Sequence, residues 1–452
     1  MNILNTYNTY YFVGIGGIGM SALARYFNYS GAKVIGYDKT QTKLTAQLQS
    51  EGIEIVFEDK IDEKLTSLDP QKTLVIYTPA IKQLDILAYL MDQKFTILKR
   101  AKVLGLITEN TECFAVAGTH GKTTTSTLVA HLCNEANLPF SCFLGGISEN
   151  FKSNFKFNGN QMSVVEADEY DRSFLNLSPN WAVVTSIDAD HLDIYGDKLH
   201  IEQSFRDFAA LVENDYQLFV RKGIEIGRPH YTYAVNEEAD FYSDALNIVK
   251  DTMYFTFHDG TESVDFQWQI PGIHNVENAT AAIAMLRKKG VSFDVLQKGI
   301  ASFKGIKRRY TKHIYDNGKI YIDDYAHHPT ELNAVINSVK TFYPNKKLLV
   351  VFQPHLFSRT RDFVEGFADS LSKADELILL DIYPARELQE NFEGVTSDWL
   401  LEKVELKNKE ISRLSEAFDK IKSKQFDVLL TVGAGNIDTL YDPILPWIEG
   451  LE

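Results

Sequence analysis

The segment Gly118-Thr119-His120-Gly121-Lys122-Thr123-Thr124 has the composition of a phosphate-binding loop. It lies between a strand pattern at 114–117 and a helical pattern at 123–137, where backbone N–H groups and the positive end of the helix dipole can hold a polyphosphate. Lys122 is expected to neutralise the β and γ phosphates, and the Thr123 hydroxyl to reach Mg²⁺. The first glycine is only three residues before Gly121, which is closer than in the GxxxxGK[ST] pattern. The alternative to a phosphate-binding loop is a glycine-rich turn with a solvated lysine.

Two acidic clusters follow the next strand patterns. Glu166-Ala167-Asp168-Glu169 ends the pattern at 163–167, and Asp188-Ala189-Asp190-His191-Leu192-Asp193 follows the pattern at 182–187. If these strands are parallel, both clusters emerge at the same sheet edge as the phosphate loop. Carboxylates at that edge suit Mg²⁺, which takes oxygen ligands from carboxylates, phosphates and water. A solvated acidic loop explains either cluster alone equally well, and the phosphate loop favours the metal site.

A second glycine loop, Gly14-Ile15-Gly16-Gly17-Ile18-Gly19, lies near the N-terminus between a strand and a helix. Asp38 ends the following strand pattern 19 residues after Gly19, which is the spacing of a dinucleotide fingerprint. The motif indicates that a diphosphate can approach the helix start. It leaves open whether the ligand is a nicotinamide dinucleotide or another nucleoside diphosphate.

The last third of the chain has two polar segments at predicted strand ends. Asp323-Asp324-Tyr325-Ala326-His327-His328-Pro329 follows one strand, and its histidines could mark only a helix start, since Pro is favoured there. The second segment, 353–361, carries Arg359 and Arg361, and guanidinium groups commonly hold a carboxylate or phosphate. Both arginines face one side if the segment is extended, whereas a helix that has begun by Ser358, the expected N-cap, lets only Arg359 reach the site. The helix is favoured.

The elements that position these residues follow an alternation of short apolar runs and helical periodicity, which is typical of an α/β fold with parallel sheets. The predicted strands are 10–15, 33–37, 74–78, 114–117, 163–167, 182–187, 319–323, 348–353, 376–380 and 428–432. Boundaries near 106–111 and 303–312 predict three domains, over 1–107, 108–310 and 311–452. Short alternating strands over about 215–270 are expected to extend the middle sheet in antiparallel fashion.

The composition is that of a folded globular chain. The 452 residues are 44% hydrophobic and 24% charged, and the net charge of -15 argues against a nonspecific nucleic-acid or anionic-membrane binder. Three cysteines fit neither a disulfide framework nor a metal site, which favours a reducing cytoplasm. A signal peptide and a membrane span are not expected.

Taken together, the motifs resemble those of the Mur ligase family, ATP-dependent enzymes that build the peptide of the bacterial cell-wall precursor. The likeness runs in order along the whole chain, through G-I-G-G-I-G-M-S from Gly14, G-T-H-G-K-T-T from Gly118, E-A-D-E from Glu166, D-H-L-D from Asp190, G-I-H-N-V-E-N from Gly272, R-R at Arg308, D-D-Y-A-H-H-P-T-E from Asp323 and Q-P-H at Gln353. The resemblance implies an N-terminal Rossmann-like domain for a uridine nucleotide, a central P-loop ATPase-type α/β domain with a mainly parallel sheet, and a C-terminal Rossmann-like domain for an amino acid.

The alanine-adding branch of the family is the most similar. Its activity implies that ATP phosphorylates the lactyl carboxylate of UDP-N-acetylmuramate, that the amine of L-alanine attacks the acyl phosphate, and that a tetrahedral intermediate collapses to the amide, ADP and phosphate. Such a reaction depends mostly on positioning and charge neutralisation. The likeness implies ATP and two Mg²⁺ as cofactors, a place in peptidoglycan synthesis in the cytoplasm, and no nucleic-acid or membrane partner. It leaves the oligomeric state open.

The matching motifs also imply individual roles. Lys122, Glu166, His191, His327 and Arg359 are the expected catalytic residues, with Thr123, Glu166 and His191 as metal ligands. The expected nucleotide contacts are Gly118, Thr119, His120, Gly121, Lys122, Thr123, Thr124, Asn275, Asn278, Arg309 and Asp324. The expected contacts of the other substrates are Gly14, Gly16, Gly17, Ile18, Gly19, Asp38, Thr78, Tyr325, His327 and Arg359.

This chain departs from the family pattern at a few positions. Phe205 stands where many members have a carbamylated lysine, and it joins Phe208, Ala209 and Val212 in an apolar helical face. Ser186 replaces a usual Asn, and Leu356 and Phe357 replace an Arg-Tyr pair.

Three other functions compete with this interpretation. A recycling ligase that joins UDP-N-acetylmuramate to a ready-made tripeptide shares the ATPase core. A nicotinamide-dependent oxidoreductase could use Gly14, Gly16, Gly19 and Asp38, but leaves the loop at Gly118 without a role. A nucleotide-gated switch would not need the polar residues of a third domain.

Overall fold

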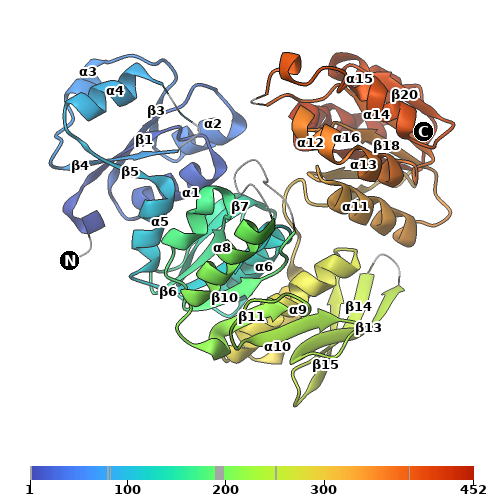
Figure 1. Ribbon diagram of the computed structural model, residues 1–452, viewed down its shortest axis with the longest axis horizontal. Coiled ribbons are helices and arrows are strands. Elements are labelled where there is room, and N and C mark those ends of the chain that lie inside the picture. Colours follow the sequence, from blue (N-terminus) through green and yellow to red (C-terminus); the bar gives the residue numbers. More distant parts are fainter. Residues whose placement is uncertain are drawn as a thin grey trace. The chain divides into compact units, whose positions relative to one another are not determined.

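A computed structural model describes residues 3–78, 81, 83–188, 198–249, 252–385 and 387–451. The chain divides into two compact units. Figure 1 labels the helices and strands along the chain. The first comprises Met1–Asn247, Tyr254–Trp268 and Asn275–Lys304, and the second Ile248–Met253, Gln269–His274 and Gly305–Glu452. The expected N-terminal domain and most of the expected central domain thus fall within one unit, and the domain boundaries at 107 and 310 stay predictions.

The N-terminal sheet of the first unit is parallel, with the order β3-β2-β1-β4-β5. Its strands are β1 (Thr9–Val13), β2 (Lys33–Tyr37), β3 (Glu54–Val56), β4 (Thr73–Tyr77) and β5 (Thr96–Lys99), and its helices are α1 (Ile18–Tyr29), α2 (Lys43–Ser50), α3 (Glu63–Thr66), α4 (Asp85–Asp92) and α5 (Arg100–Thr108). The strand order reverses at β1 and β4. Ligands of such folds bind at this switch point, beyond the carboxyl ends of the strands.

The central sheet of the first unit has the order β15-β14-β13-β12-β11-β10-β6-β9-β7-β8. Its strands are β6 (Glu112–Ala117), β7 (Phe140–Ser148), β8 (Ser153–Phe157), β9 (Met162–Ala167), β10 (Trp181–Val184), β11 (Leu218–Arg221), β12 (Tyr231–Val235), β13 (Phe241–Val249), β14 (Thr252–His258) and β15 (Ser263–Trp268). Its helices are α6 (Lys122–Glu135), α8 (Lys198–Ala210), α9 (Ile273–Lys288) and α10 (Phe293–Ser302). β6 lies between β9 and β10 and is parallel to both, so the phosphate loop and both acidic segments start at one edge.

The prediction that the middle sheet continues in antiparallel fashion is wrong for the strands from β10 to β13. β10 to β11, β11 to β12 and β12 to β13 all pair in parallel. Strand alternation reports which residues are buried but not the direction of the neighbouring strand, so the sequence pattern could not separate the two arrangements.

The second unit contains a six-stranded sheet in the order β16-β17-β21-β18-β19-β20. Its strands are β16 (Thr311–Ile314), β17 (Ile320–Asp324), β18 (Leu348–Phe352), β19 (Glu376–Leu380), β20 (Lys409–Ser412) and β21 (Val428–Val432). Its helices are α11 (Pro329–Phe342), α12 (Phe357–Asp362), α13 (Val364–Leu371), α14 (Ser397–Lys403), α15 (Leu414–Lys422) and α16 (Tyr441–Glu449). β16 is antiparallel to β17, and the remaining pairs are parallel. The α/β class and its mainly parallel sheets, predicted from the sequence, are confirmed.

Helices cover both faces of this sheet. Along β18, Leu348, Val350 and Phe352 pack with side chains of α11 and α13, while Leu349 and Val351 pack with those of α15 and α16. Because successive side chains point to opposite faces, a strand buried on both faces must be apolar throughout, as this one is.

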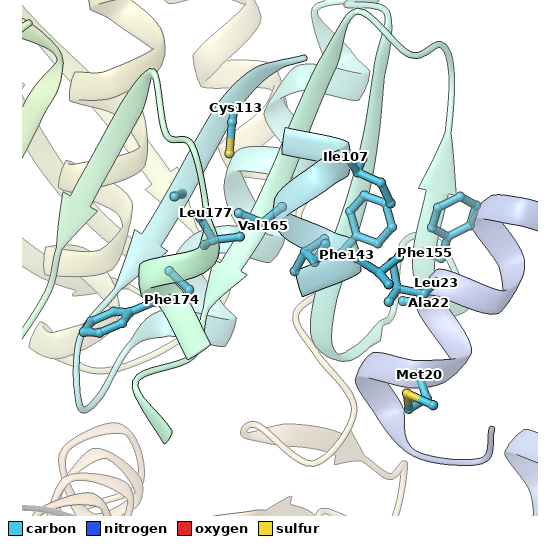
Figure 2. Close-up of a cluster of buried hydrophobic side chains, with 14 of the residues drawn as sticks. Met20, Ala22, Leu23, Ile107, Cys113, Phe143, Phe155, Val165, Phe174 and Leu177 are labelled. Atoms are coloured by element: carbon cyan, nitrogen blue, oxygen red, sulfur yellow. The ribbon is translucent and has the colours of Figure 1, made fainter. Parts of the chain in front are cut away.

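In the first unit one apolar core joins the N-terminal and central sheets. Ala22 and Leu23 of α1 lie near Phe143 of β7 and Phe155 of β8 (Figure 2), and Met20 of the same helix belongs to the same core. The apolar face predicted around Phe205 and Phe208 is fully buried in the same core. Across the described ranges, no helix combines the length and the apolar character that crossing a membrane requires.

All ten predicted strands are present, with small differences at their ends. β1 stops at Val13 instead of residue 15, because Gly14 has φ +88° and turns the chain. β10 stops at Val184 instead of residue 187, because the next residues bond to the phosphate loop. Strand ends thus depend on these local contacts.

Candidate active site

The phosphate loop connects β6 to α6 through two glycines with positive φ. Gly118 has φ +144° and Gly121 has φ +82°, conformations that residues with a Cβ rarely adopt. A Cβ on Gly118 would lie 1.9 Å from Oγ1 of Thr185, and one on Gly121 would lie 2.5 Å from Oδ1 of Asn278. The glycines therefore let the loop run against the end of β10 and against α9.

Hydrogen bonds fix this loop to the residue after Thr185. Thr119 N donates to the Ser186 carbonyl at 3.0 Å, and His120 N donates to Ser186 Oγ at 2.8 Å. The hydroxyls of Ser186 and Thr119 also share a 2.8 Å hydrogen bond. A serine hydroxyl both donates and accepts, so Ser186, which departs from the family pattern, orients the loop in this chain.

Lys122 is the first residue of α6 and forms a buried ion pair. Its Nζ lies 2.8 Å from Oε2 of Glu169, and the two side chains are 13% and 2% exposed. The same ammonium donates to the carbonyls of Gly118 and Thr119. Burial acts to lower the pKa of Lys122, but the carboxylates of Glu169 and Glu166 outweigh it and raise the pKa. The lysine is therefore held charged at the loop.

A hydroxyl and a carboxylate meet beside this lysine. Thr123 Oγ1 donates to Oε1 of Glu166 at 3.1 Å, and Gly145 N donates to Oε2 at 3.1 Å. Two hard oxygen donors at a phosphate loop suit Mg²⁺. Among the residues that the structure describes, no group of three or more His, Cys, Asp or Glu side chains forms a cage for a metal, and His191 lies outside the described residues.

Thr124, Asn275 and Asn278 lie around the same loop. Thr124 is in the first turn of α6, and Asn278 of α9 approaches Gly121. Asn275 is three residues earlier on α9, so it shares a face with Asn278, and both are buried.

The N-terminal glycine loop is closed by Asp38. Gly16 N donates to Oδ2 of Asp38 at 2.7 Å, and a Cβ on Gly16 would lie 2.8 Å from that oxygen and from Cγ2 of Thr45. Thr78, just after β4, lies against Gly14. A Cβ on Gly14 would be 3.3 Å from Cγ2 of Thr78. Asp38 was expected to contact substrate, and it also holds the loop in shape.

Gly17 is the N-cap of α1, and Ile18, its first residue, is exposed. A Cβ on Gly19 would lie 2.7 Å from Nη1 of Arg100. Nη2 of Arg100 in turn lies 3.3 Å from Oδ2 of Asp168. An arginine thus lies between the N-terminal glycine loop and the end of β9.

In the second unit, Asp324 ends β17 and is buried. Its carboxylate accepts from Tyr310 N and Ala326 N, each at 2.7 Å. Burial raises the pKa of Asp324 to about 6, against the opposing effect of Arg309. The Arg309 guanidinium lies 5.2 Å from the ring centroid of Tyr325.

His327 lies next to Tyr325, with ring centroids 5.2 Å apart. Burial lowers the pKa of His327 to about 4, although Glu331 acts to raise it. The backbone N of His327 donates to Glu331 Oε2 at 3.1 Å. At neutral pH the imidazole is therefore uncharged, so its free ring nitrogen can accept a hydrogen bond.

Arg359 and Arg361 differ in their surroundings. Arg359 is buried on α12, and its charge acts to lower the pKa of His327. Arg361 is exposed, and its Nε donates to Asp362 at 2.8 Å. The predicted helix is present, so only Arg359 points to the buried side.

The N-cap predicted for that helix is wrong. α12 begins at Phe357, and Leu356 is the N-cap with φ +71°. Ser358 N instead donates to Glu387 at 3.0 Å, and the Ser358 hydroxyl bonds to the same carboxylate. Phe357 is buried with Ile382 and Val395, so the departure at position 357 extends an apolar cluster.

The structure collects the predicted residues at sheet edges in each unit. The first unit brings together the phosphate loop, Thr123, Glu166 and Asn278, and it places the N-terminal glycine loop near Asp168. The second unit brings together Asp324, Tyr325, His327 and Arg359, with Arg309 beside them. Sequence reasoning missed Glu169 as the partner of Lys122, and it missed Arg100 entirely. Glu169 stands in a quoted motif, whereas a lone arginine at a helix start gave no signal.

Comparisons with known proteins agree on one family. Sequence models match the chain over residues 9–111 (Mur ligase family, catalytic domain), 116–286 (Mur ligase middle domain) and 308–435 (Mur ligase, glutamate ligase domain). A UDP-N-acetylmuramate–L-alanine ligase of Flavobacterium psychrophilum is 49% identical over 436 residues, 96% of each chain. One of Parabacteroides distasonis is 45% identical, covering 98% of this chain and 97% of its own.

Solved structures agree with these relatives. A UDP-N-acetylmuramate-alanine ligase from Thermotoga maritima superposes with a TM-score of 0.83 at 27% identity, over 98% of this chain and 99% of that one. A murein peptide ligase from Psychrobacter arcticus shares the fold, with a TM-score of 0.69 at 21% identity over 98% and 99% of the two chains.

Proposed function

The chain belongs to the Mur ligase family, and on this premise we propose that it joins L-alanine to the lactyl carboxylate of UDP-N-acetylmuramate at the expense of ATP. The observation that carries the proposal is the full-length likeness, at up to 49% identity, to ligases named for that reaction. The reaction is a step of peptidoglycan precursor synthesis, and we propose that it takes place in the cytoplasm.

In the proposed reaction the γ-phosphoryl group of ATP moves to a carboxylate oxygen, which gives an acyl phosphate and ADP. The amine of alanine then attacks the acyl carbon, and phosphate leaves as the amide forms. A carboxylate is a poor acceptor because its charge repels the γ-phosphate, so the site must neutralise charge. Lys122, held charged at the phosphate loop, is suited to this role.

Thr123 and Glu166 would hold a Mg²⁺ ion, which would neutralise phosphate charge when bound. Their hydrogen bond at 3.1 Å places two suitable oxygens together, and this fit supports one ion. A second Mg²⁺ held by Glu166 and His191 is part of the proposal. The fully buried Phe205 offers no metal ligand at the position where many members have a lysine.

We assign the substrates to the three predicted domains. The N-terminal segment, 1–107, is proposed to bind the uridine diphosphate through Gly14, Gly16, Gly17 and Gly19. The segment 108–310 is proposed to bind ATP. The segment 311–452 is proposed to receive alanine at Tyr325, His327 and Arg359, with Arg309 and Asp324 facing the nucleotide.

His327 has the properties needed to assist the amine. The imidazole is uncharged at neutral pH, because burial lowers its pKa to about 4. It can therefore accept a hydrogen bond from the ammonium of alanine while Arg359 binds the carboxylate. A neutral acceptor beside a cationic donor matches the ammonium and carboxylate ends of an amino acid.

The decisive experiment measures phosphate release from ATP with UDP-N-acetylmuramate, across single amino acids and the cell-wall tripeptide. We expect turnover only with both co-substrates present, with alanine preferred and ADP formed in step with the amide. Turnover with the tripeptide and none with alanine would identify the recycling reaction instead. Calorimetry with NADH is the control for a nicotinamide ligand, and we expect no binding.

Two variants test the metal and the uridine site separately. Glu166→Gln should raise the Mg²⁺ concentration needed for half activity. Gly16→Val places a side chain against Asp38 and Thr45, so it should raise the KM for UDP-N-acetylmuramate and spare that for ATP. An unchanged Mg²⁺ titration, or equal effects on both KM values, would contradict the corresponding assignment.

A further inference from the structure

Arg100 begins α5 at a position that helix energetics do not favour for a cation. The N-cap is Lys99, its side chain makes no capping bond, and the first turn has no acidic residue. The N-terminus of a helix carries a partial positive charge, so a cation there is destabilising by a few tenths of a kcal/mol to about 1 kcal/mol. Helix stability does not account for the arginine.

The guanidinium is held between two loops of the first unit. Nη1 lies beside Gly19 at the start of α1, where the lack of a Cβ makes room for it. Nη2 lies 3.3 Å from Oδ2 of Asp168, in the segment that carries Glu166. The Arg100 side chain is only 23% exposed, so its charge is largely shielded from water.

The guanidinium also has donors to spare. Within the described ranges of the chain, its hydrogen bond is the one to Asp168, which leaves Nε, Nη1 and part of Nη2 for another acceptor. Asp168 itself is 40% exposed, so the pair is partly solvated. A guanidinium carries five N–H donors in a planar fork that suits phosphate and carboxylate oxygens.

A small pocket, open to solvent, lies against this residue. Its polar lining comes from Arg100, Glu166, Asp168 and Ser173, and its apolar lining includes Phe174 and Leu177. The pocket therefore joins the arginine to Glu166, the carboxylate assigned to the phosphate-transfer site.

We propose that Arg100 binds an anionic oxygen of the sugar nucleotide, between the N-terminal glycine loop and the end of β9, and that Asp168 orients its guanidinium for this. The inference rests on the proposed function and deepens it by naming a binding residue for the acceptor. The diphosphate and the lactyl carboxylate both present anionic oxygens to a guanidinium. Nη1 lies beside the N-terminal glycine loop and Nη2 beside Asp168, the two segments between which such an anion would bind.

The contacts of this arginine favour the acceptor over ATP as its ligand. The contacts of the phosphate loop run to Glu169 and Glu166 through Lys122 and Thr123. Arg100 instead contacts Gly19, which belongs to the loop assigned to the uridine nucleotide. Its loss should therefore act on the acceptor and spare ATP.

The test compares Arg100→Met, Arg100→Lys and a matched control, Lys99→Ala. Lys99 is the neighbouring residue and pairs with Asp171 at 3.6 Å, with both side chains about half exposed. The control removes an ion pair between the same two segments without touching Gly19. Affinity for UDP-N-acetylmuramate is measured by calorimetry without ATP, and KM values for both substrates are measured in the coupled assay.

Arg100→Met should weaken binding of UDP-N-acetylmuramate about ten- to hundredfold, as expected for loss of a charge-assisted hydrogen bond, with KM for ATP unchanged. Arg100→Lys should recover part of the affinity, and Lys99→Ala should stay within about twofold of the wild type. UDP-N-acetylglucosamine, which has the diphosphate but no lactyl carboxylate, separates the two anions. A loss with both ligands indicates the diphosphate, and a loss only with the muramate indicates the carboxylate.

Equal affinity in Arg100→Met and wild type, with a lowered melting temperature, would overturn the inference and leave Arg100 as a structural tie. That result leaves the proposed function intact, because the wild type still binds and turns over the acceptor. If the wild type itself does not bind UDP-N-acetylmuramate, the proposed function fails and this inference fails with it.

Discussion

At the scale of single residues, Lys122 is bound by three acceptors of its own chain. Its ammonium donates to the carbonyls of Gly118 and Thr119 and pairs with Glu169. An ammonium has three donors, so a phosphate must displace at least one of these partners. Glu169 therefore competes with ATP for the lysine.

We predict opposite effects of two substitutions on ATP binding. Lys122→Ala should raise the KM for ATP by about ten- to hundredfold, because a charge-assisted contact worth about 1.5–3 kcal/mol is lost. Glu169→Gln should lower that KM, because the carboxamide keeps the shape but no longer competes with its charge. Steady-state kinetics at saturating acceptor and alanine check both.

A stability measurement separates competition from simple positioning. Without nucleotide, Glu169→Gln should unfold at a lower temperature, because a mostly buried ammonium loses its counter-charge at a cost of roughly 3–5 kcal/mol. Adding ATP should restore most of the loss. A raised KM for ATP in both variants would show that Glu169 positions the lysine and does not compete.

A second residue-scale prediction concerns the two arginines of α12. Arg359 is buried beside His327, whereas Arg361 is exposed and paired with Asp362. With alanine as the varied substrate, Arg359→Ala should lose about tenfold or more in kcat/KM, and Arg361→Ala should lose less than about threefold. Comparable losses would show that both guanidinium groups reach the carboxylate.

At the scale of elements, the end of β17 depends on a buried carboxyl. Asp324 binds Tyr310 N and Ala326 N, so it ties the strand to the segment before β16. Burial raises its pKa from 3.8 to about 6, so the folded state binds the proton more tightly than the unfolded state. The stability contributed by the protonated form is therefore present below pH 4 and is lost as the pH rises through 6.

We predict that Asp324→Asn removes this pH dependence. Relative to the wild type, the free energy of unfolding of the variant should rise by about 3 kcal/mol between pH 3 and pH 7, because the pKa shift from 3.8 to about 6 corresponds to that energy. The variant keeps only one carbonyl acceptor, so it can be less stable at every pH. Denaturant unfolding at several pH values gives the difference, and a constant difference would contradict the buried carboxyl.

At the scale of the whole molecule, one buried network ties the two sheets of the first unit. Arg25 of α1 makes two hydrogen bonds to Glu51, at 2.8 and 2.9 Å, and another to Asn154 of β8. Nδ2 of Asn154 donates to Ser21 Oγ at 3.0 Å. The guanidinium is 2% exposed and links the nucleotide-loop helix to the central sheet.

We predict that this network makes the two sheets unfold together. Arg25→Met should cost roughly 3–5 kcal/mol, because Oδ1 of the buried Asn154 and the partly buried Glu51 carboxylate lose the guanidinium that pairs with them. Amide exchange followed by mass spectrometry should then be faster in the N-terminal sheet than in β6 and β9. Lys64→Ala is the control, since its ion pair with Glu54 is exposed to solvent and should contribute little to stability. Equal acceleration in both sheets would contradict this role for the network.

The sequence by itself determined the α/β class, the positions of the glycine loops and the polar residues at strand ends. These properties are local. Hydrophobic periodicity indicates which residues are buried, and glycines indicate turns that other residues rarely make. Gly118 and Gly121 adopt positive φ values at such a turn. The family motifs added roles to residues that were already recognisable by type and spacing.

The tertiary structure decided the partners that come from distant segments. Glu169 meets Lys122 across 47 residues, and Arg100 meets Asp168 across 68. The parallel direction of β11 to β13 and the buried side of α12 also depend on neighbours that are remote in the chain. A charged side chain has the same sequence signature whether it is solvated or paired, because pairing depends on which segments the fold brings within a few ångströms of each other.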